Sequence, residues 1–301
     1  MRTIFDRQLL TAVVLGTAVA VNSLAYAAPA NSGAYVNVQK QVTSSISWEK
    51  GNAAGVEAEG IGLPPAGTSG TRASLLARRA AIVDAYRMLA ETVNTVQLDA
   101  ETTVQDLAVT SDVVRTKVSA LIKGARIVSE HANGDGSYSV KIAVPLYGVD
   151  GVAGTALPEI KSTLPAAAPS VSYDYTPGKD LRANASGYTG VIIDARGLGL
   201  ESTFSPVVFD TNGRAVYGMR NIDKDYAIKY GMVGYARSVN SDSAAERAGV
   251  RPLVLKAKAV RSGRNSANPV NVVISVDDAD KLLYVNEKAG ILDKRAVVFV
   301  K

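Results

Sequence analysis

The segment SLLARRAAIVDAYRMLAETV, residues 74–93, constrains the fold most, because its apolar residues recur at the spacing of one helix face. At about 100° per residue they fall within a single stripe. The stripe consists of Leu75, Ile82, Tyr86, Leu89 and Val93, with Val83 and Ala90 on its flank. We therefore predict a long amphipathic helix that packs this stripe against another layer.

Charged residues on this helix fall on both sides of it. Arg79 lies inside the apolar stripe and Arg78 at its edge. Asp84, Arg87 and Glu91 fall on the opposite side, where Arg87 and Glu91 have the i,i+4 spacing of a surface ion pair. We predict that this opposite side faces solvent.

Arg79 needs a partner if the stripe is buried. A buried guanidinium without one is costly, so Arg79 must reach solvent at the rim or meet an acceptor. Glu57 and Glu59, on the preceding predicted strand, are the nearest acceptors along the sequence. Alternatively, Arg78 and Arg79 contact a ligand carboxylate or phosphate. We favour the internal pair, in which Arg79 connects helix and sheet, because fixed arginines more often pair internally.

Residues 28–150 are interpreted as a first domain with the element order β-β-α-(β)-α-β-β. The optional strand is TVQLDAETTV, and Ser111 and Gly124 have the positions of a cap and a stop around a shorter helix. Asn133-Gly134-Asp135-Gly136 is a hairpin turn. The order predicts an α+β domain, a mainly antiparallel sheet with helices on one face.

The following residues predict a linker and a second domain. Residues 151–187 are rich in Ala, Pro, Ser, Thr and Gly, as linkers are. Residues 188–301 contain a strand at Gly190–Ala195 and a hairpin at Asn212-Gly213, where both residues are expected to have positive φ. We predict a second small α+β domain, again a mainly antiparallel sheet with helices on one face, that folds independently of the first.

The first 27 residues have the features of a secretory signal peptide. Arg2 and Arg7 precede an apolar run from Leu9 to Val21, which is short for a bilayer span, and the small-residue site Ala25-Tyr26-Ala27 follows. This order predicts cleavage before Ala28. The mature protein is expected to be periplasmic or associated with the outer membrane, with no transmembrane segment.

Composition limits the means of anchoring and the classes of partner. The chain has no cysteine, which excludes a disulfide framework and the acylated cysteine of a bacterial lipid anchor. The net charge of +5 is mild and spread along the chain, so nucleic acid is not an expected partner of an exported protein. Binding to an anionic wall polymer stays an option.

Side chains suited to catalysis are scarce. The single histidine, His131, lies beside the first hairpin turn, and no Gly-x-Ser-x-Gly motif occurs. Gly197 and Gly199 follow a strand but lack the third glycine and the helix of a dinucleotide site, so they predict a bend. We predict a protein that is not an enzyme and has no cofactor.

Three aspartates, Asp277, Asp278 and Asp280, form the densest acidic cluster. They precede KLLYV, where acidic residues cap a helix and complement its dipole. The spacing and glycine of a calcium loop are absent. A helix cap is the favoured interpretation over a carboxylate site, and no metal site is predicted.

Several of these segments together resemble a known family. AEGIGLPP, LLARRAAIVDAYRMLAETV, LIKGARIVSE and GDGSYSVKIAVPL are similar to the N-terminal domain of flagellar assembly protein T and to the related small outer-membrane lipoprotein family. The resemblance covers about residues 55–148 and includes Arg78, Asp84, Arg87 and Glu91. It implies an exported, non-catalytic α+β module, in one branch a ring component around the flagellar motor. The second domain resembles uncharacterised envelope proteins.

Two functions follow from these observations. The first is an envelope protein that acts in structure or assembly through contacts with other envelope proteins or by self-association, with a flagellar role as one option. The alternative is a module that binds peptidoglycan or another envelope polymer through basic residues and tyrosines. The tyrosines considered are Tyr217, Tyr226, Tyr230 and Tyr235.

Overall fold

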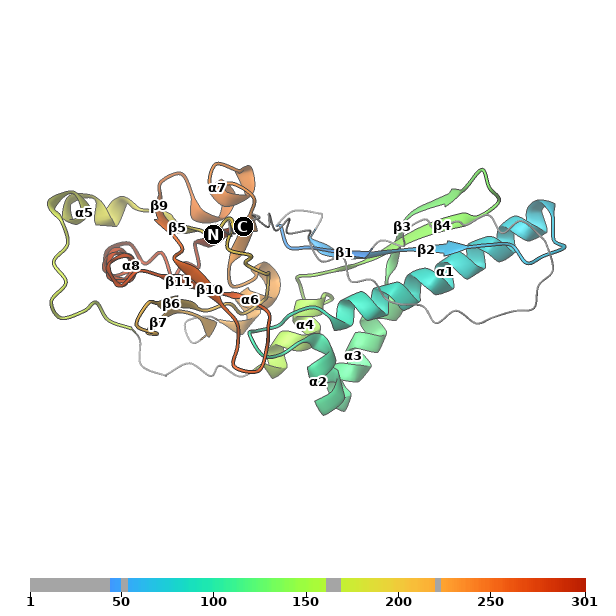
Figure 1. Ribbon diagram of the computed structural model, residues 1–301, viewed down its shortest axis with the longest axis horizontal. Helices are drawn as coiled ribbons and strands as arrows, with labels where there is room; N and C mark the ends of the chain where they lie inside the picture. Colours follow the sequence, from blue (N-terminus) through green and yellow to red (C-terminus); the bar gives the residue numbers. More distant parts are fainter. Residues whose placement is uncertain (1–43, 50–53, 161–168, 220–222) are drawn as a thin grey trace, which may run out of the picture. The chain divides into compact units, whose positions relative to one another are not determined.

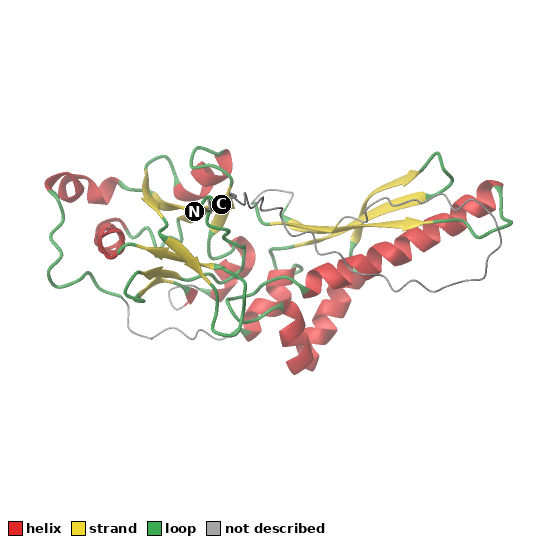
Figure 2. Ribbon diagram, in the orientation of Figure 1, coloured by secondary structure: helices red, strands yellow, loops and turns green. Residues whose placement is uncertain are grey.

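The computed structural model describes residues 44–49, 54–160, 169–219 and 223–301. Gln41–Lys301 form one compact unit. The described residues combine helices with three four-stranded sheets, so the predicted α+β class is confirmed (Figures 1 and 2). The predicted signal peptide and its cleavage site lie outside the described residues.

The first sheet is antiparallel throughout, with the strand order β1-β2-β4-β3. Alternate residues of β2 and β4, such as Val56 and Ile142, are buried on one face, and the long helix α1 packs along that face (Figure 1). The predicted helix-covered sheet and the hairpin between β3 and β4 are thus confirmed. The bounds are β1 Ser44–Ser47, β2 Gly55–Gly62, α1 Gly70–Asn94, β3 Arg126–Ala132 and β4 Tyr138–Pro145.

Glycine and alanine allow α1 to lie directly on β2. A Cβ at Gly62 would come within 2.0 Å of the Ala77 carbonyl oxygen, and one at Gly60 within 2.1 Å of the Ala85 backbone nitrogen. Ala77, Ala81 and Ala85 are fully buried. Strand positions without side chains therefore face small helix residues, and the two backbones approach closely.

Two helices connect α1 to β3 where one was predicted. In α3, Asp112–Lys123, the Ser111 hydroxyl accepts the Val114 N–H at 3.3 Å, and Gly124 ends the helix as expected. The additional helix α2, Val104–Thr110, begins with a capping box that Thr103 forms. Of the optional strand only an isolated bridge between Gln97 and Thr103 is present.

The sheet β8-β12-β5-β9 is parallel throughout, so the prediction of a mainly antiparallel sheet is wrong for this part of the second half. β5 and β12 have the sequences GVIID and VVFV and are buried on both faces, which is typical of parallel strands. The bounds are β5 Gly190–Asp194, α6 Lys224–Tyr230, β8 Gly234–Ala236, α7 Asp242–Ala248, β9 Pro252–Lys256 and β12 Val297–Val300.

The sheet β10-β11-β6-β7 is mixed, because β11 and β6 are parallel while both outer pairs are antiparallel. The hairpin at Asn212-Gly213 exists, but only Gly213 has a positive φ, since the loop spans four residues and not two. Ser275 caps α8. The bounds are β6 Val208–Asp210, β7 Ala215–Tyr217, β10 Ala259–Arg261, β11 Asn271–Ile274 and α8 Val276–Ala289.

The segment predicted as a linker is not a bare spacer over residues 152–160. There, α4 (Val152–Ala156) and η1 (Leu157–Glu159) bury apolar side chains. Gly154 permits this tight fold, because a Cβ would come within 2.3 Å of the Val149 carbonyl oxygen. Further along are α5 (Lys179–Asn184) and η2 (Ala185–Gly187). Independent folding of the two halves stays a prediction.

Candidate functional site

Arg79 is exposed, so the prediction that it lies in a buried helix face is wrong. Four residues turn an α-helix about 40° beyond a full turn, so a contact made every fourth residue winds around the helix. The predicted straight stripe therefore coincides with the buried residues only at Leu89 and Val93. At the start of the helix the buried side is that of Ala77, and Arg79 lies on the opposite side. The buried residues are Ala77, Ala81, Ala85, Leu89 and Val93.

Neighbouring charges make the contacts with the sheet. Arg78 connects α1 to β3, because its Nε donates to Glu130 Oε2 at 2.8 Å. Asp84, expected to face solvent, accepts the Ile61 N–H of β2 through Oδ2 at 3.2 Å. These two contacts fix the helix on the strands, the role that the sequence assigned to Arg79.

The remaining predicted residues lie apart from Arg79. Arg87 forms the expected pair with Glu91 at 2.9 Å and also pairs with Asp84 at 2.8 Å. Glu57 and Glu59 are half-buried on the sheet face away from α1. Among the described residues, neither of these glutamates pairs with Arg79.

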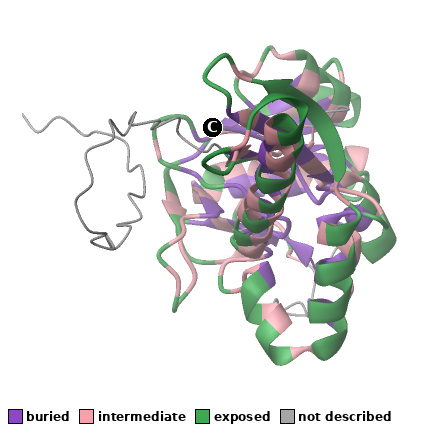
Figure 3. Ribbon diagram, turned by 90° about the vertical axis from the view of Figure 1, so that its right-hand side faces the viewer, coloured by how far each residue is buried: buried purple, intermediate pink, exposed green. Residues whose placement is uncertain are grey.

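The outer face of α1, which we define as Leu75, Arg79 and Val83, is exposed to solvent. Figure 3 colours the chain by burial, with exposed residues in green. Leu75 is 56% exposed and Val83 is 69% exposed. Two large apolar side chains therefore accompany an exposed guanidinium, one helical turn away on each side.

A pocket of about 550 Å³ lies at the carboxyl ends of β5, β8 and β12, and we call it the strand-end pocket. Ala195, Arg237 and Lys301, which follow directly after these strands, line it. Trp48, which follows β1, lines it as well. Ligands of open sheets with parallel strands bind outside the carboxyl ends, which makes this pocket the strongest candidate for ligand binding.

Aromatic rings form the apolar wall of the strand-end pocket. The Trp48 ring lies edge-on to Tyr235 and Phe204, with centroid distances of 5.8 and 4.8 Å. The Tyr235 hydroxyl accepts the Thr203 N–H and donates to the Thr203 carbonyl, both at 2.9 Å. Burial raises the pKa of Tyr235, which therefore stays neutral. Its hydroxyl is used internally, and because Tyr235 is only 3% exposed, a small part of its ring borders the pocket.

The polar side chains of the pocket are the hydroxyls of Ser47 and Ser202, the cations of Arg237 and Lys301, and the carboxylate of Glu49. The Lys301 ammonium lies 5.9 Å from the centroid of the Tyr235 ring. Lys301 is exposed as a residue, yet partial loss of water around its ammonium lowers its pKa, and the charge of Glu201 opposes this shift. Arg237 Nε approaches Glu49 Oε2 only at 4.0 Å. The pocket thus contains two cations, Lys301 and Arg237, and the one carboxylate paired with them, Glu49, approaches Arg237 only at 4.0 Å.

The glycines considered as a phosphate cradle also line this pocket. Gly197 and Gly199 have φ of 78° and 73°, and they form the bend predicted after β5. The adjacent Arg196 is occupied by Asp194, with contacts of 2.9 and 2.6 Å. Hydrogen bonds from Arg196 lower the pKa of Asp194 and keep the carboxylate charged. The loop therefore lines the pocket with the backbone of its glycines, while Arg196 is paired with Asp194 and does not contribute a free cation.

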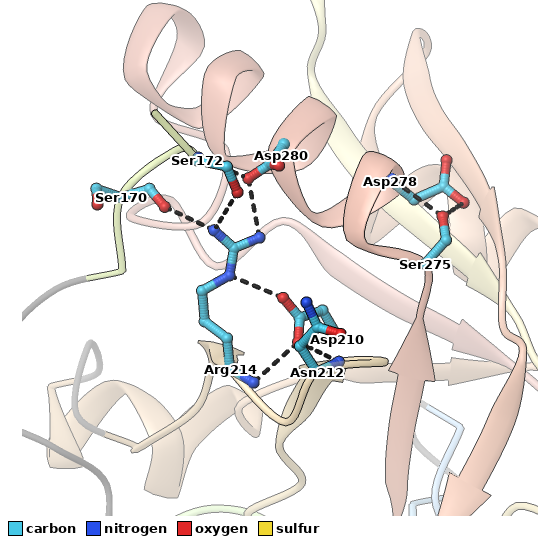
Figure 4. Close-up of polar contacts among 8 residues, drawn as sticks. All are labelled: Ser170, Ser172, Asp210, Asn212, Arg214, Ser275, Asp278 and Asp280. Atoms are coloured by element: carbon cyan, nitrogen blue, oxygen red, sulfur yellow. Dashed lines mark hydrogen bonds and ion pairs between the residues drawn. The ribbon is translucent and has the colours of Figure 1, made fainter. Parts of the chain in front are cut away.

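Arg214 holds together a buried polar cluster (Figure 4). Its Nε donates to Asp210 at 2.9 Å and its Nη2 to Asp280 at 2.8 Å. Its Nη1 donates to the Ser170 carbonyl at 2.9 Å and to Ser172 Oγ at 3.3 Å. These hydrogen bonds connect the β6–β7 hairpin, the segment at 170–172 and α8. Both aspartates are buried, so we interpret the cluster as a structural contact.

The acidic cluster of α8 is divided between two roles. Asp277 and Asp278 lie in the first turn, and Ser275 is the cap, which agrees with the predicted helix start. Asp280 points to Arg214. Burial alone would raise the pKa of Asp280, but hydrogen bonds from Ser172 and Arg214 lower it overall.

The tyrosines proposed for polymer binding do not form a common surface. Tyr217 and Tyr235 are buried in the core, and the Tyr217 hydroxyl donates to the Met232 carbonyl at 2.8 Å. Tyr226 and Tyr230 contact each other with ring centroids 4.9 Å apart. The alternative of a surface formed by all four tyrosines is therefore wrong, because Tyr217 and Tyr235 pack in the core.

His131 lies exposed on β3, opposite Ser139 in the register. Within the described ranges, no three acidic or histidine side chains are placed to hold a metal ion. None of the helices in the described part of the chain has the length and apolar character of a membrane span.

Comparisons with known proteins match the two halves separately. Residues 65–144 match the family model of the LPP20 lipoprotein. Residues 190–301 match the model of the second domain of Treponema pallidum Tp0624. No curated protein matches the chain. The two matches agree with two domains.

The LPP20 match supports the lipoprotein branch of the resemblance. No flagellar assembly protein T model matches, so the flagellar branch has no support from the comparisons. Because the chain has no cysteine, the similarity concerns the folded domain and not an acylated anchor.

Sequence reasoning missed the strand-end pocket. Trp48, Ser202 and Lys301 are far apart in the sequence and carry no motif. The available signal was the unbroken apolar character of β5 and β12, which favours a parallel sheet and hence a site at its carboxyl edge.

Proposed function

We propose that the chain is a non-enzymatic envelope protein that acts in structure or assembly by binding another protein through the outer face of α1. The observation that supports this most is the exposure of Leu75 and Val83 beside Arg79, on a helix whose opposite face is packed on β2. Exposed apolar side chains rimmed by charge mark contact surfaces. The LPP20 match includes α1 and agrees with an envelope role.

Charge on this face defines the chemistry of the partner. Arg72 and Arg79 are exposed and have no ion pair among the described residues, whereas Arg87 is neutralised by Asp84 and Glu91. A complementary surface combines apolar groups with acidic side chains. The partner is therefore an acidic, partly apolar protein surface of the envelope.

Crosslinking in whole envelopes tests the proposal. The double variant Arg79→Glu, Val83→Glu is expected to lose the crosslinked partner and to keep its circular dichroism spectrum, since both residues are exposed. Lys117→Glu, the same charge reversal as Arg79→Glu at an exposed position of α3, is the control and is expected to keep the partner. Unchanged crosslinking of the double variant would remove the outer face of α1 from the proposal.

A second candidate function is binding to peptidoglycan, favoured by the aromatic wall and the cations of the strand-end pocket. Retention of the purified chain on isolated peptidoglycan, reduced by Trp48→Ala but not by the α1 double variant, would support this function over the first.

A further inference from the structure

The strand-end pocket contains a buried hydroxyl that the protein itself does not use. Ser202 is 9% exposed and lines the pocket, and its Oγ has no hydrogen-bond partner among the described residues. Buried hydroxyl groups are normally hydrogen-bonded, because leaving one unpaired costs free energy. A ligand in the pocket would supply the missing partner.

A cation in the same pocket also lacks a partner. Lys301 forms no ion pair with a carboxylate among the described residues, although its ammonium lies against the Tyr235 ring. The nearby pair of Arg237 and Glu49 is long, at 4.0 Å, and the Arg237 side chain is 91% exposed. With Lys301 and Arg237 as cations and Glu49 as the carboxylate of the lining, the net charge of the pocket is positive.

Apart from Ser47 and Glu49, the rest of the wall is largely apolar. Trp48 is half-buried and lines the cavity, whereas Tyr235 borders it with a small part of its ring and turns its hydroxyl to Thr203. A volume of about 550 Å³ accommodates one small molecule.

We propose that the strand-end pocket binds a small molecule that carries one carboxylate on a ring or short apolar body. The body lies on Trp48 and Ile46, and the carboxylate accepts hydrogen bonds from Lys301 and Ser202. Acidic sugars of the cell wall and short fatty acids share this chemistry. This binding site is independent of the outer face of α1.

Tryptophan fluorescence reads out the pocket directly, because Trp48 is the single tryptophan of the chain. The probes are N-acetylmuramic acid against N-acetylglucosamine, and octanoate against octanol, titrated into the full chain. At least one of the two acids is expected to change the fluorescence in a saturable way. Its neutral counterpart is expected to bind at least about tenfold more weakly. The responding pair identifies the source. Absence of a saturable change with either acid, or equal binding of acid and neutral counterpart, would overturn the proposal.

Two variants assign the polar contacts. Lys301→Gln is expected to weaken binding of the acid about tenfold, whereas Lys256→Gln, at another exposed lysine, leaves it unchanged. Ser202→Ala is expected to weaken binding while the Tm stays the same or rises, because an unpaired buried hydroxyl is removed. If Ser202→Ala lowered the Tm and left binding intact, the hydroxyl would have an internal role and the proposal would be wrong.

Discussion

At the scale of single residues, the absence of side chains at Gly60 and Gly62 decides how α1 lies on the first sheet. The atoms that a new Cβ would meet belong to the helix backbone, which cannot move aside as a flexible side chain can. The same contact explains why the helix buries alanines along its first part and turns Leu75 and Arg79 outward.

We therefore expect Gly62→Ala to lower the free energy of unfolding by about 3 kcal/mol or more, the upper range for overpacking. Gly134→Ala is the matched control, since no atom lies within 4 Å of its Cβ position. The control is expected to change stability by less than about 0.5 kcal/mol. Urea unfolding measures both, and equal values for the two variants would contradict the close contact.

At the scale of elements, Arg214 determines how the β6–β7 hairpin, residues 170–172 and α8 are held together. Its removal leaves Asp210 and Asp280 buried without their cation, and their side chains are only 2% and 3% exposed. We expect Arg214→Ala to cost about 3–5 kcal/mol in urea unfolding, as breaking a buried pair does. Arg115→Ala breaks an exposed pair with Asp112 and should cost much less. Similar losses for both would show that the cluster is not a buried contact.

The same cluster predicts a dependence of stability on pH. The pKa of Asp280 is lowered in the folded protein, so its contribution is complete above the unfolded pKa of about 3.9 and is lost as pH falls through the folded value. The wild type should therefore lose stability below about pH 4 more steeply than Asp280→Asn, which has no proton to gain there. Thermal unfolding between about pH 2 and 6 measures the two slopes, and parallel curves would contradict this account.

Elements were predictable from sequence where a local signal specifies them. Ser111, Gly124 and the turn at residues 133–136 gave correct helix ends and a correct hairpin. The parallel sheet was not predicted, because parallel pairing joins strands far apart in the chain, as β5 and β12 are. The buried side of α1 was predicted wrongly because the prediction used only the large apolar residues. The side that packs on β2 is set by the alanines of the helix and the glycines of the strand.

At the scale of the whole molecule, the larger of two buried apolar clusters contains residues of both halves, while a smaller one lies within the second half. Phe204 is 1% exposed and contacts Trp48 and Tyr147 with ring centroids 4.8 and 5.7 Å apart. Polar contacts join the same halves, since Asn268 Nδ2 donates to Gln97 Oε1 at 2.8 Å. The sequence predicts two domains that fold independently, whereas this shared core favours cooperative unfolding of both.

Phe204→Ala distinguishes these two outcomes. Removing a buried phenylalanine costs about 3–5 kcal/mol, and because Phe204 touches residues of both halves, the loss should reach both. We expect one transition in which Trp48 fluorescence and circular dichroism coincide, with a midpoint lowered by the variant. Tyr173→Ala, at a fully exposed tyrosine, is the control and should leave the midpoint unchanged. Two separate transitions, only one of them shifted by Phe204→Ala, together with two stable fragments after limited proteolysis, would instead support independent domains.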